Sequence, residues 1–411
     1  MRLLRRFIAR LISWSGEALL TCSLNLFFDN HDGKAFKECM EELWRVIHIL
    51  SKHQNRWERM RIWSNNITPT SHLALRLEDL CFLRELMLDT NNNSPFPLVD
   101  WGSDSSASLC PKLKMLDANN LPTAQLLRLL TSGSEALEEL HLCLHSDDDG
   151  SYDDYDDDSD DNNNTTAPPN ADLPIILKKH LLILIIRTCT YSITPQIDGL
   201  LQRLDCPSIE IVDLAGMTCQ TLRSLDTLLH RGPGSIAGAL FALELSFASR
   251  LDTDDGVDRS CRCVDSRLAA LLREMPVLKR LSITFDDSSN VTQTLTHLSL
   301  TVESPSSSGL VRPRYLPSLK RLEFKLATAE QEQFARMIRN RWSSSGGSRS
   351  FAVELVDCLA TDDGVRFPLP VFPSEMGPDG RWGQIESYVA EGLEFSTSYT
   401  DDSWLDHSAE F

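Results

Sequence analysis

The 411-residue sequence has no uninterrupted apolar run of eighteen residues, which excludes a conventional membrane-spanning helix. It also lacks the motifs of several enzyme classes: no G-x-x-x-x-G-K-[ST] phosphate loop, no G-x-S-x-G nucleophile elbow and no H-E-x-x-H zinc motif occurs. The glycines at Gly232 and Gly234 surround a proline ahead of a predicted strand, and therefore indicate a turn. We expect neither an enzyme nor a bound cofactor.

Basic charge is also scarce. The chain has 40 Lys and Arg against 59 Asp and Glu, with a formal net charge of −19. Proteins that bind nucleic acids present basic patches to the phosphate backbone, so a nucleic-acid partner is not expected. Ten aspartates lie between Asp147 and Asp161. Residues 146–172 are almost wholly polar and have little to bury, which predicts a disordered acidic loop.

Paired metal-ligand patterns are missing as well. Cys261-x-Cys263 has no second Cys or His pair to complete a zinc site. His141 and His145 would need Asp147–Asp149 to form a metal site, and a solvated strand edge explains them without one. The same acidic stretch lacks the ligand spacing of a calcium loop. No metal site is expected.

The eleven cysteines are odd in number and scattered. Several lie inside apolar runs, as Cys143 and Cys189 do. Buried free thiols in a reducing compartment are the simplest explanation. We therefore expect an intracellular protein, in the cytoplasm and/or nucleus, that meets no membrane.

One phrase is present repeatedly, and it is clearest at Leu137, Leu140 and Leu142: L-x-x-L-x-L, the core of a leucine-rich repeat. Six further copies fit it: Leu83/Leu86/Leu88, Ile209/Val212/Leu214, Leu240/Leu243/Leu245, Leu278/Leu281/Ile283, Leu295/Leu298/Leu300 and Leu319/Leu322/Phe324. Looser copies begin at Trp57, Leu113 and Leu181. The fourth and sixth positions of each copy share one strand face, which a single strand cannot bury alone, so neighbouring repeats are expected to stack.

Helical patterns separate these predicted strands. Leucines recur at helical spacing after Thr123 and again from Leu222 to Leu229. Residues 328–342 show a third pattern, in which Thr328 and Gln331 fit a capping box. Phe334, Met337 and Ile338 would face inward there, whereas Arg250–Asp265 is expected to be an inserted loop. The predicted fold is an α/β leucine-rich-repeat solenoid, a horseshoe with irregular repeats and a disordered acidic insertion.

The chain is predicted to have five parts. These are an N-terminal helical and capping segment (1–56), the solenoid (57–358, containing the 146–172 loop), a Pro-rich linker (359–383), a C-terminal capping helix and strand (384–399) and an acidic tail (400–411).

Residues 1–20 form an amphipathic pattern with four arginines and no acidic residue before Glu17. This pattern is typical of a mitochondrial presequence. It is also typical of a helix packed on the first repeat, which is favoured because Leu24, Leu26 and Phe28 follow at strand spacing.

Strand alternation also predicts the functional surface, because the residues between the buried positions point to the opposite face. We expect this concave face to bind a protein target through a set that is acidic at first and mixed with basic residues later. The predicted residues are Glu85, Met87, Asp89, Glu139, His141, Asp213, Glu244, Ser282, Ser299, Arg321, Glu323 and Lys325.

Segment order gives a resemblance to the leucine-rich-repeat proteins of mushroom-forming fungi that usually carry an N-terminal F-box. The similar segments are Leu11-Ile12-Ser13-Trp14-Ser15-Gly16, Asn55-Arg56-Trp57-Glu58-Arg59-Met60-Arg61-Ile62, Cys110-Pro111-Lys112-Leu113, Met337-Ile338-Arg339-Asn340-Arg341-Trp342 and Glu391-Gly392-Leu393-Glu394-Phe395. This family resemblance implies substrate recognition for a cullin-RING ubiquitin ligase, with an SKP-type adaptor and a cullin as further partners.

The sequence departs from that family at its beginning. An F-box opens with a Leu-Pro-x-Glu-type turn, and no proline precedes Pro69. The expected function is therefore non-enzymatic target binding, as the substrate-recognition part of an F-box-type protein. The alternatives are a ubiquitin-independent leucine-rich-repeat scaffold or inhibitor, and a truncated product without an F-box.

Overall fold

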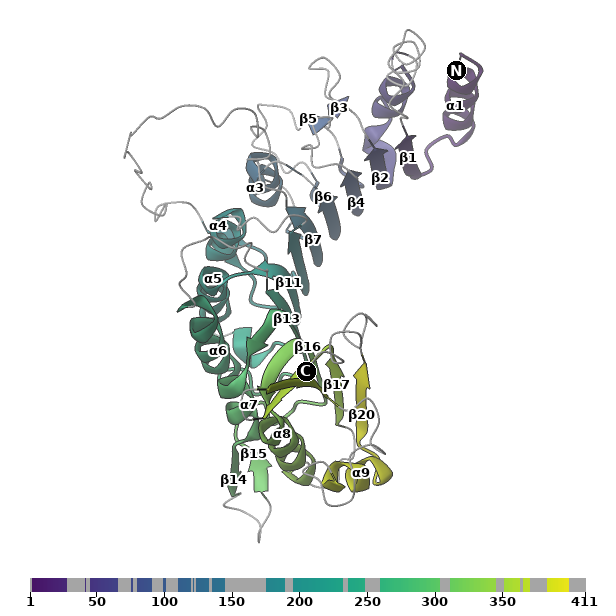
Figure 1. Cartoon of the computed structure of the whole chain (residues 1–411). Coiled ribbons are helices and arrows are strands. Elements are labelled where there is room, and N and C mark those ends of the chain that lie inside the picture. The colour runs from purple at the N-terminus through teal and green to yellow at the C-terminus, as the bar shows by residue number, and fades with distance from the viewer. Residues whose placement is uncertain are drawn as a thin grey trace, which may run out of the picture. The chain divides into compact units, whose positions relative to one another are not determined.

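The computed structural model describes residues 2–27, 41, 45–65, 75–76, 80–90, 99–100, 110–119, 121, 123–132, 135–144, 175–188, 195–231, 236–247, 259–303, 311–344, 351–362, 365–369 and 383–398. The chain forms two compact units, Met1–Pro207 and Ser208–Phe411. Both belong to an α/β fold with a large, mostly parallel sheet (Figure 1).

Unit 1 contains a row of parallel strands in the order β1 (Leu20–Phe27), β2 (Trp57–Asn65), β4 (Glu85–Thr90), β6 (Met115–Asn119), β7 (Glu139–Leu144) and β9 (Ile183–Thr188). Two short parallel pairs lie outside this row: β3 (Leu75–Arg76) with β5 (Val99–Asp100), and β8 (Ile176–Leu177) with β10 (Leu204–Asp205). The helices of this unit include α1 (Arg2–Trp14), the 3₁₀ helix η1 (Gln54–Arg56), α3 (Thr123–Ser132) and α4 (Pro195–Arg203). Residues 45–51 are also helical.

Unit 2 has parallel strands in the order β11 (Ile211–Met217), β12 (Ala242–Phe247), β13 (Arg280–Asn290), β16 (Arg321–Glu330), β17 (Ala352–Val356) and β20 (Glu394–Ser398). Two antiparallel pairs join β14 (Thr301–Glu303) to β15 (Val311–Pro313), and β18 (Leu359–Asp362) to β19 (Val365–Pro368). Its helices include α5 (Cys219–His230), η2 (Ile236–Gly238), α6 (Arg259–Leu272), α7 (Thr292–Ser299), α8 (Gln331–Ser344) and α9 (Gly383–Ala390). Helices α5, α6 and α7 follow one side of the strands (Figure 1).

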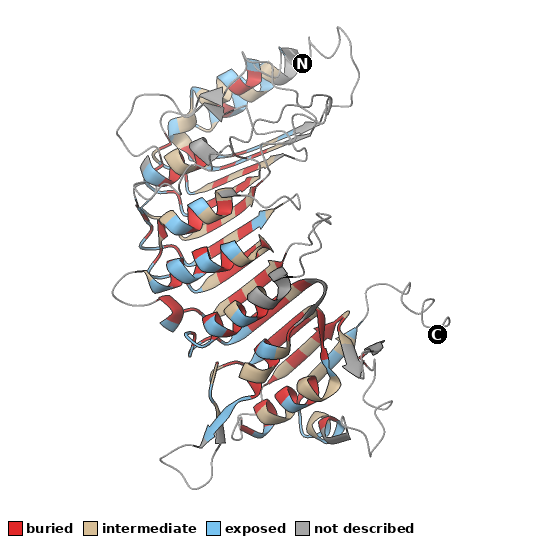
Figure 2. Cartoon of the chain, turned by 60° about the vertical axis from the view of Figure 1, so that its left-hand side comes forward, coloured by how far each residue is buried: buried red, intermediate tan, exposed pale blue. Residues whose placement is uncertain are grey.

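The strand register aligns the repeated phrase. Its fourth positions are paired in sequence along each unit: Met60, Leu86, Leu116, Leu140 and Leu184 in unit 1, and Val212, Leu243, Leu281, Leu322 and Val353 in unit 2. All are at most 2% exposed. Figure 2 shows the resulting alternation of buried and partly exposed residues along the strands. The strands predicted at these copies are confirmed, including the looser ones at Trp57, Leu113 and Leu181.

A turn precedes several of these strands. The backbone N–H of Leu83, Leu113, Leu181, Leu278 and Leu319 each donates to the carbonyl of the residue three positions earlier. That earlier residue is buried every time: Leu80, Cys110, Lys178, Met275 and Leu316. Each of these five repeats thus buries one more position than the phrase itself contains, and in one of them this position is a lysine.

One copy of the phrase is a helix instead of a strand. Leu295 and Leu298 lie in α7, and Leu300 follows its end. Val291, Leu295 and Leu298 are spaced four and three apart and are all buried, as expected for one face of a helix. Ser299 is therefore not on a strand face, and its hydroxyl donates to the carbonyl of Thr296 over 2.8 Å.

The predicted capping box before α8 is also wrong. Thr328 is a buried residue of β16, and its Oγ1 has no hydrogen-bond partner. The carbonyl of Thr328 instead accepts a hydrogen bond from Val291 N–H over 3.0 Å. The helix itself is confirmed, with Phe334, Met337 and Ile338 buried.

Other predictions had mixed outcomes. The expected Arg250–Asp265 loop was wrong from Arg259 onward, because α6 begins there. Part of the predicted 359–383 linker instead forms β18 and β19. Cys143 is disulfide-bonded and not a free thiol. The C-terminal helix and strand are confirmed as α9 and β20.

The acidic loop at 146–172, the tail at 400–411 and Phe28 lie outside the described residues. None of the helices in the described ranges combines the length and the apolar composition that crossing a membrane requires.

Candidate protein-binding surface

The outward positions of the strands form one surface in each unit, which we call the polar face of that unit. In unit 1, two rows of paired residues define it: Arg59, Glu85, Met115, Glu139 and Ile183, and beside them Arg61, Met87, Asp117, His141 and Ile185. A third row begins with Trp63 paired to Asp89 and continues with Asn119 paired to Cys143. Most of these side chains are neither fully buried nor fully exposed.

Several polar groups on this face are paired across neighbouring strands. Arg59 Nε lies 3.2 Å from Glu85 Oε1. Asn119 Nδ2 donates to Asp89 Oδ1 over 2.8 Å. These contacts pair polar side chains across neighbouring strands, an arrangement suited to recognition of a partner with complementary charges.

Asp117 and His141 occupy neighbouring strands in direct register. Burial raises the pKa of the Asp117 carboxyl, and nearby Asp89 raises it further, whereas His141 and Arg61 lower it. His141 Nε2 is buried without a hydrogen-bond partner and lies 3.7 Å from Glu139 Oε2. This part of the polar face therefore combines a partly desolvated carboxyl with an imidazole nitrogen whose hydrogen-bonding capacity is unused.

The polar face of unit 2 is dominated by a row of carboxylates. Asp213, Glu244, Ser282, Glu323 and Glu354 are paired in sequence across five strands. A second row contains Arg280 and Arg321, and a third contains Lys325. Both signs of charge are thus present on this face.

Cations on this face contact the carboxylate row. Lys325 Nζ lies 2.9 Å from Glu323 Oε1, and Arg321 Nη2 lies 2.9 Å from Glu354 Oε2. The hydrogen bond with Glu323 is the main cause of a raised Lys325 pKa, and the charges of Glu244 and Glu354 also raise it. The Lys325 ammonium therefore interacts with carboxylates on three strands.

Ser282 is 2% exposed, and its Oγ makes no hydrogen bond. By register it lies between Glu244 and Glu323. A buried hydroxyl without a partner costs free energy, and a donor or acceptor on a bound molecule would remove that cost.

The predicted surface residues therefore divide into three groups. The partly or fully exposed outward positions are Glu85, Met87, Asp89, Glu139, His141, Glu244, Arg321 and Lys325. Asp213, Ser282 and Glu323 also occupy outward positions but are buried. Ser299 does not belong to the face, because it lies in α7.

The predicted surface set omits some outward residues. Arg59, Arg61 and Asp117 lie on strands of the looser repeat copies, and Glu354 lies on β17, after the repeat pattern weakens. The alternation within those strands is the signal that would have found them.

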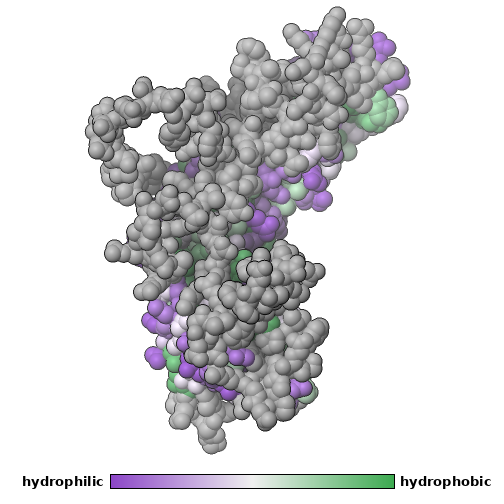
Figure 3. Space-filling model, in the orientation of Figure 1, coloured by the Kyte–Doolittle hydropathy of each residue, from purple (hydrophilic) through white to green (hydrophobic). Residues whose placement is uncertain are grey.

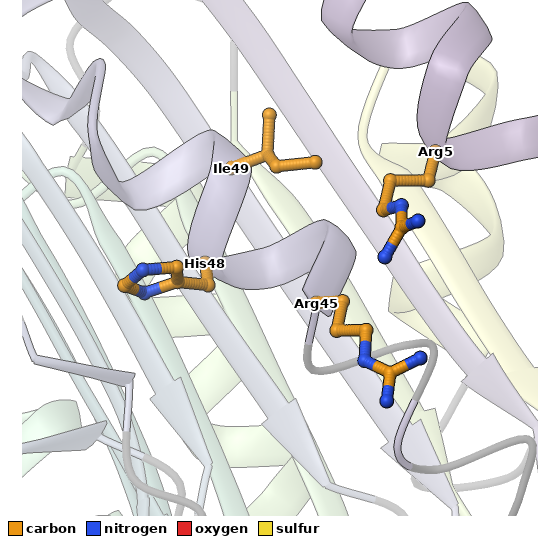
Figure 4. A pocket seen from close by; sticks show the side chains of 4 residues that line it. All are labelled: Arg5, Arg45, His48 and Ile49. Atoms are coloured by element: carbon orange, nitrogen blue, oxygen red, sulfur yellow. The ribbon is translucent and has the colours of Figure 1, made fainter. Parts of the chain in front are cut away.

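A separate pocket of about 490 Å³ lies between α1 and the helical residues 45–51. Among the described residues, Arg5, Arg45, His48 and Ile49 line it (Figure 4). The two guanidinium groups and the imidazole of these described lining residues suit a small anion. Among the described residues, no group of three or more His, Cys, Asp or Glu side chains could hold a metal ion.

The comparisons with known proteins do not assign a family. No protein-family model matches the chain, and no curated protein matches it.

Proposed function

We propose that the chain is a leucine-rich-repeat solenoid and works as a non-enzymatic protein-interaction module. Its polar faces would hold a protein target. The main support is the register of the repeat, because every paired phrase that buries its leucines also aligns its outward residues into rows. Such rows offer an extended surface of fixed side chains, which suits protein recognition better than small-molecule chemistry.

Two polar atoms support binding at these faces. His141 Nε2 in unit 1 and Ser282 Oγ in unit 2 are both buried and unsatisfied. Native proteins leave few such atoms without a hydrogen bond, so each is a candidate contact for a partner. Neighbouring ion pairs, such as Lys325 with Glu323, would orient that partner by charge.

The resemblance to F-box proteins extends this proposal. The target-binding half would serve a cullin-RING ubiquitin ligase, and an SKP-type adaptor and a cullin would be additional partners in the cytoplasm and/or nucleus. The alternative is a scaffold or inhibitor that binds its target without ubiquitin ligation. Presence or absence of the adaptor separates the two.

Affinity purification of the tagged full-length chain from fungal cells tests both parts, with quantitative mass spectrometry of the recovered proteins. Met87→Arg adds bulk and charge to the polar face of unit 1, and Glu244→Lys reverses a charge in unit 2. A matched control is Glu386→Lys, at an exposed position of α9.

A target held by the polar faces should be lost with Met87→Arg or Glu244→Lys and retained with Glu386→Lys. Equal recovery with all three variants would contradict the proposed surface. Recovery of an SKP-type adaptor with the wild type supports the ligase role, whereas recovery of a target without adaptor or cullin supports the scaffold.

A further inference from the structure

Helix α1 presents an apolar stripe to solvent. Phe7, Leu11 and Trp14 are spaced four and three residues apart and therefore share one helix face. Their side chains are 56%, 45% and 75% exposed. A helix of a soluble domain ordinarily turns such a stripe toward the core.

Among the described residues, the contacts of α1 with the rest of unit 1 lie on another side of the helix. Ile12 is buried, and Ser15, just after the helix, accepts a hydrogen bond from Arg56 Nη2 over 2.7 Å. Arg56 also donates from Nε and Nη2 to the carbonyl of Ala18, over 3.0 and 2.8 Å. The helix is thus fastened near its C-terminal end, and this attachment leaves the Phe7 stripe uncovered.

The charges beside the stripe have one sign. Arg6 and Arg10 are exposed and form the row next to Phe7 and Leu11. No acidic residue precedes Glu17, although the chain as a whole carries a formal charge of −19. Arg5 lines the pocket next to residues 45–51 and is not counted with this row (Figure 4). In the region of α1, hydrophobic and hydrophilic side chains lie next to each other at the surface (Figure 3).

We propose that α1 docks on an anionic lipid bilayer, lying in the plane of the membrane surface. Phe7, Leu11 and Trp14 enter the boundary between headgroups and acyl chains, and Arg6 and Arg10 contact the anionic headgroups. Exposed aromatic and leucine side chains beside a purely basic row are the composition of interfacial helices. This binding is independent of the proposed target recognition by the polar faces. It revises the sequence-based expectation that the chain meets no membrane.

Flotation of the full-length protein with lipid vesicles tests the proposal. Vesicles of phosphatidylcholine alone are compared with vesicles containing about one third phosphatidylserine. The protein should float with the anionic vesicles, and raising the salt concentration should weaken its binding. Flotation that is equal on neutral and anionic vesicles, or absent on both, would overturn the proposal.

Two groups of variants locate the contact. Phe7→Ser combined with Leu11→Ser and Trp14→Ser removes the stripe, and Arg6→Glu with Arg10→Glu reverses the basic row. Each basic residue near an anionic surface strengthens partitioning by about fivefold, so the double reversal should lower the partition coefficient by at least about 25-fold. Loss of the stripe should abolish flotation.

The matched control changes exposed apolar side chains elsewhere, in Phe241→Ser with Val302→Ser. Flotation should be unchanged, and far-UV circular dichroism and the thermal unfolding midpoint should match the wild type in every variant. If the control reduces flotation as much as the stripe variant does, α1 is not the contact. Sedimentation velocity detects a competing occupant: a dimer that the stripe variant abolishes, without flotation of the wild type, would assign the stripe to a second copy of the chain.

Discussion

Asp265 on α6 holds the first turn of α7 through Thr294. Its Oδ1 accepts hydrogen bonds from the backbone N–H of Thr294 over 2.8 Å and from the Thr294 hydroxyl over 2.5 Å. Its Oδ2 accepts another from Gln293 N–H over 2.7 Å. A side chain of one helix thereby supplies the N-terminal cap of the next helix, whereas a cap usually comes from the residue that begins the helix.

Asp265→Ala should lower the free energy of unfolding by about 2 kcal/mol, because it leaves two backbone donors and one hydroxyl without their acceptor. Urea denaturation followed by circular dichroism measures this. Asp226→Ala on α5 is the control, since Asp226 is exposed and its contact with His230 contributes little. Equal midpoints for the two variants would contradict the capping role.

Arg341 on α8 binds three backbone carbonyls. Its guanidinium donates to Leu298, Leu316 and Tyr315 over 2.7, 2.8 and 2.7 Å. Arg341→Met should destabilise unit 2 by about 3 kcal/mol, because the buried carbonyls lose their donors.

Arg341→Lys should destabilise as well, since an ammonium group cannot replace a planar fork of donors. The control is Arg336→Met, at an exposed position of the same helix. The urea unfolding midpoints of the variants and the wild type are compared. If Arg341→Lys is as stable as the wild type, a positive charge at this position is sufficient for stability and the planar donor geometry is not needed.

Lys178 occupies a position that is apolar in other repeats. It is 4% exposed, and burial lowers its pKa, although Cys206 and Glu135 oppose that shift. Lys178→Met should raise the free energy of unfolding by about 1 kcal/mol or more at neutral pH, because the buried ammonium is costly. Lys179→Met, at the exposed neighbouring position, should change little.

The Lys178 effect should also depend on pH. Above its lowered pKa the folded protein releases a proton that the unfolded chain still binds, so this residue makes stability rise with pH up to the ordinary lysine value. The advantage of Lys178→Met over the wild type should therefore shrink in alkaline buffer. The unfolding free energies of both proteins are measured from pH 7 to 10. A stability difference that stays constant over this range would contradict the prediction.

The Asp117 carboxyl should give stability the opposite dependence on pH. Its pKa is raised in the folded protein, mainly by burial. Between the ordinary pKa of a carboxyl group and the raised pKa of Asp117, the folded state keeps a proton on this residue that the unfolded state has already released. Stability from this residue then falls with rising pH. Asp117→Asn should be stabilising at pH 7 and show a smaller advantage near pH 4. Denaturation curves at both values test this, and an advantage independent of pH would refute it.

Buried thiols should react slowly in the folded protein. Burial raises the pKa of Cys110 and Cys358 to about 12 and that of Cys22 to about 11. The reactive thiolate is therefore scarce at pH 8. Cys81 and Cys219 are partly exposed, so iodoacetamide should label them before Cys22, Cys110 and Cys358, as peptide mass spectrometry would detect. In urea the rates should converge, and rapid native labelling of Cys110 would contradict its burial.

Leucine spacing predicted most strands because their buried face has to repeat every two residues. Copies with poor leucine matches, such as Trp57 to Ile62, still formed strands, because any large apolar side chain fills the same row. Leu295 to Leu300 misled the prediction, since leucines three apart fit a helix as well as the phrase. The deciding contact, the cap from Asp265, lies 29 residues away in sequence.

The candidate surface was less predictable than the strands. Alternation placed Glu85 and Glu244 on the outward face, but it could not show that Ser282 is covered while Glu244 is not. Whether such a residue is covered depends on the long side chains beside it on the neighbouring strands, and the strand register decides which side chains those are. The exposed stripe of α1 was visible as a pattern in the sequence, but which side would pack depended on Arg56 and its distant contacts with Ser15 and Ala18.

Helix α7 is held at both ends by hydrogen bonds with the neighbouring helices. Asp265 of α6 holds its beginning, while Arg341 and Asn340 of α8 bind the carbonyls of Leu298 and Ser299 at its end. Eight residues are too few for a helix to persist alone in water. The backbone amides of α7 should therefore exchange with deuterium only when a neighbouring helix opens, which makes this short helix an internal reporter of cooperativity in unit 2.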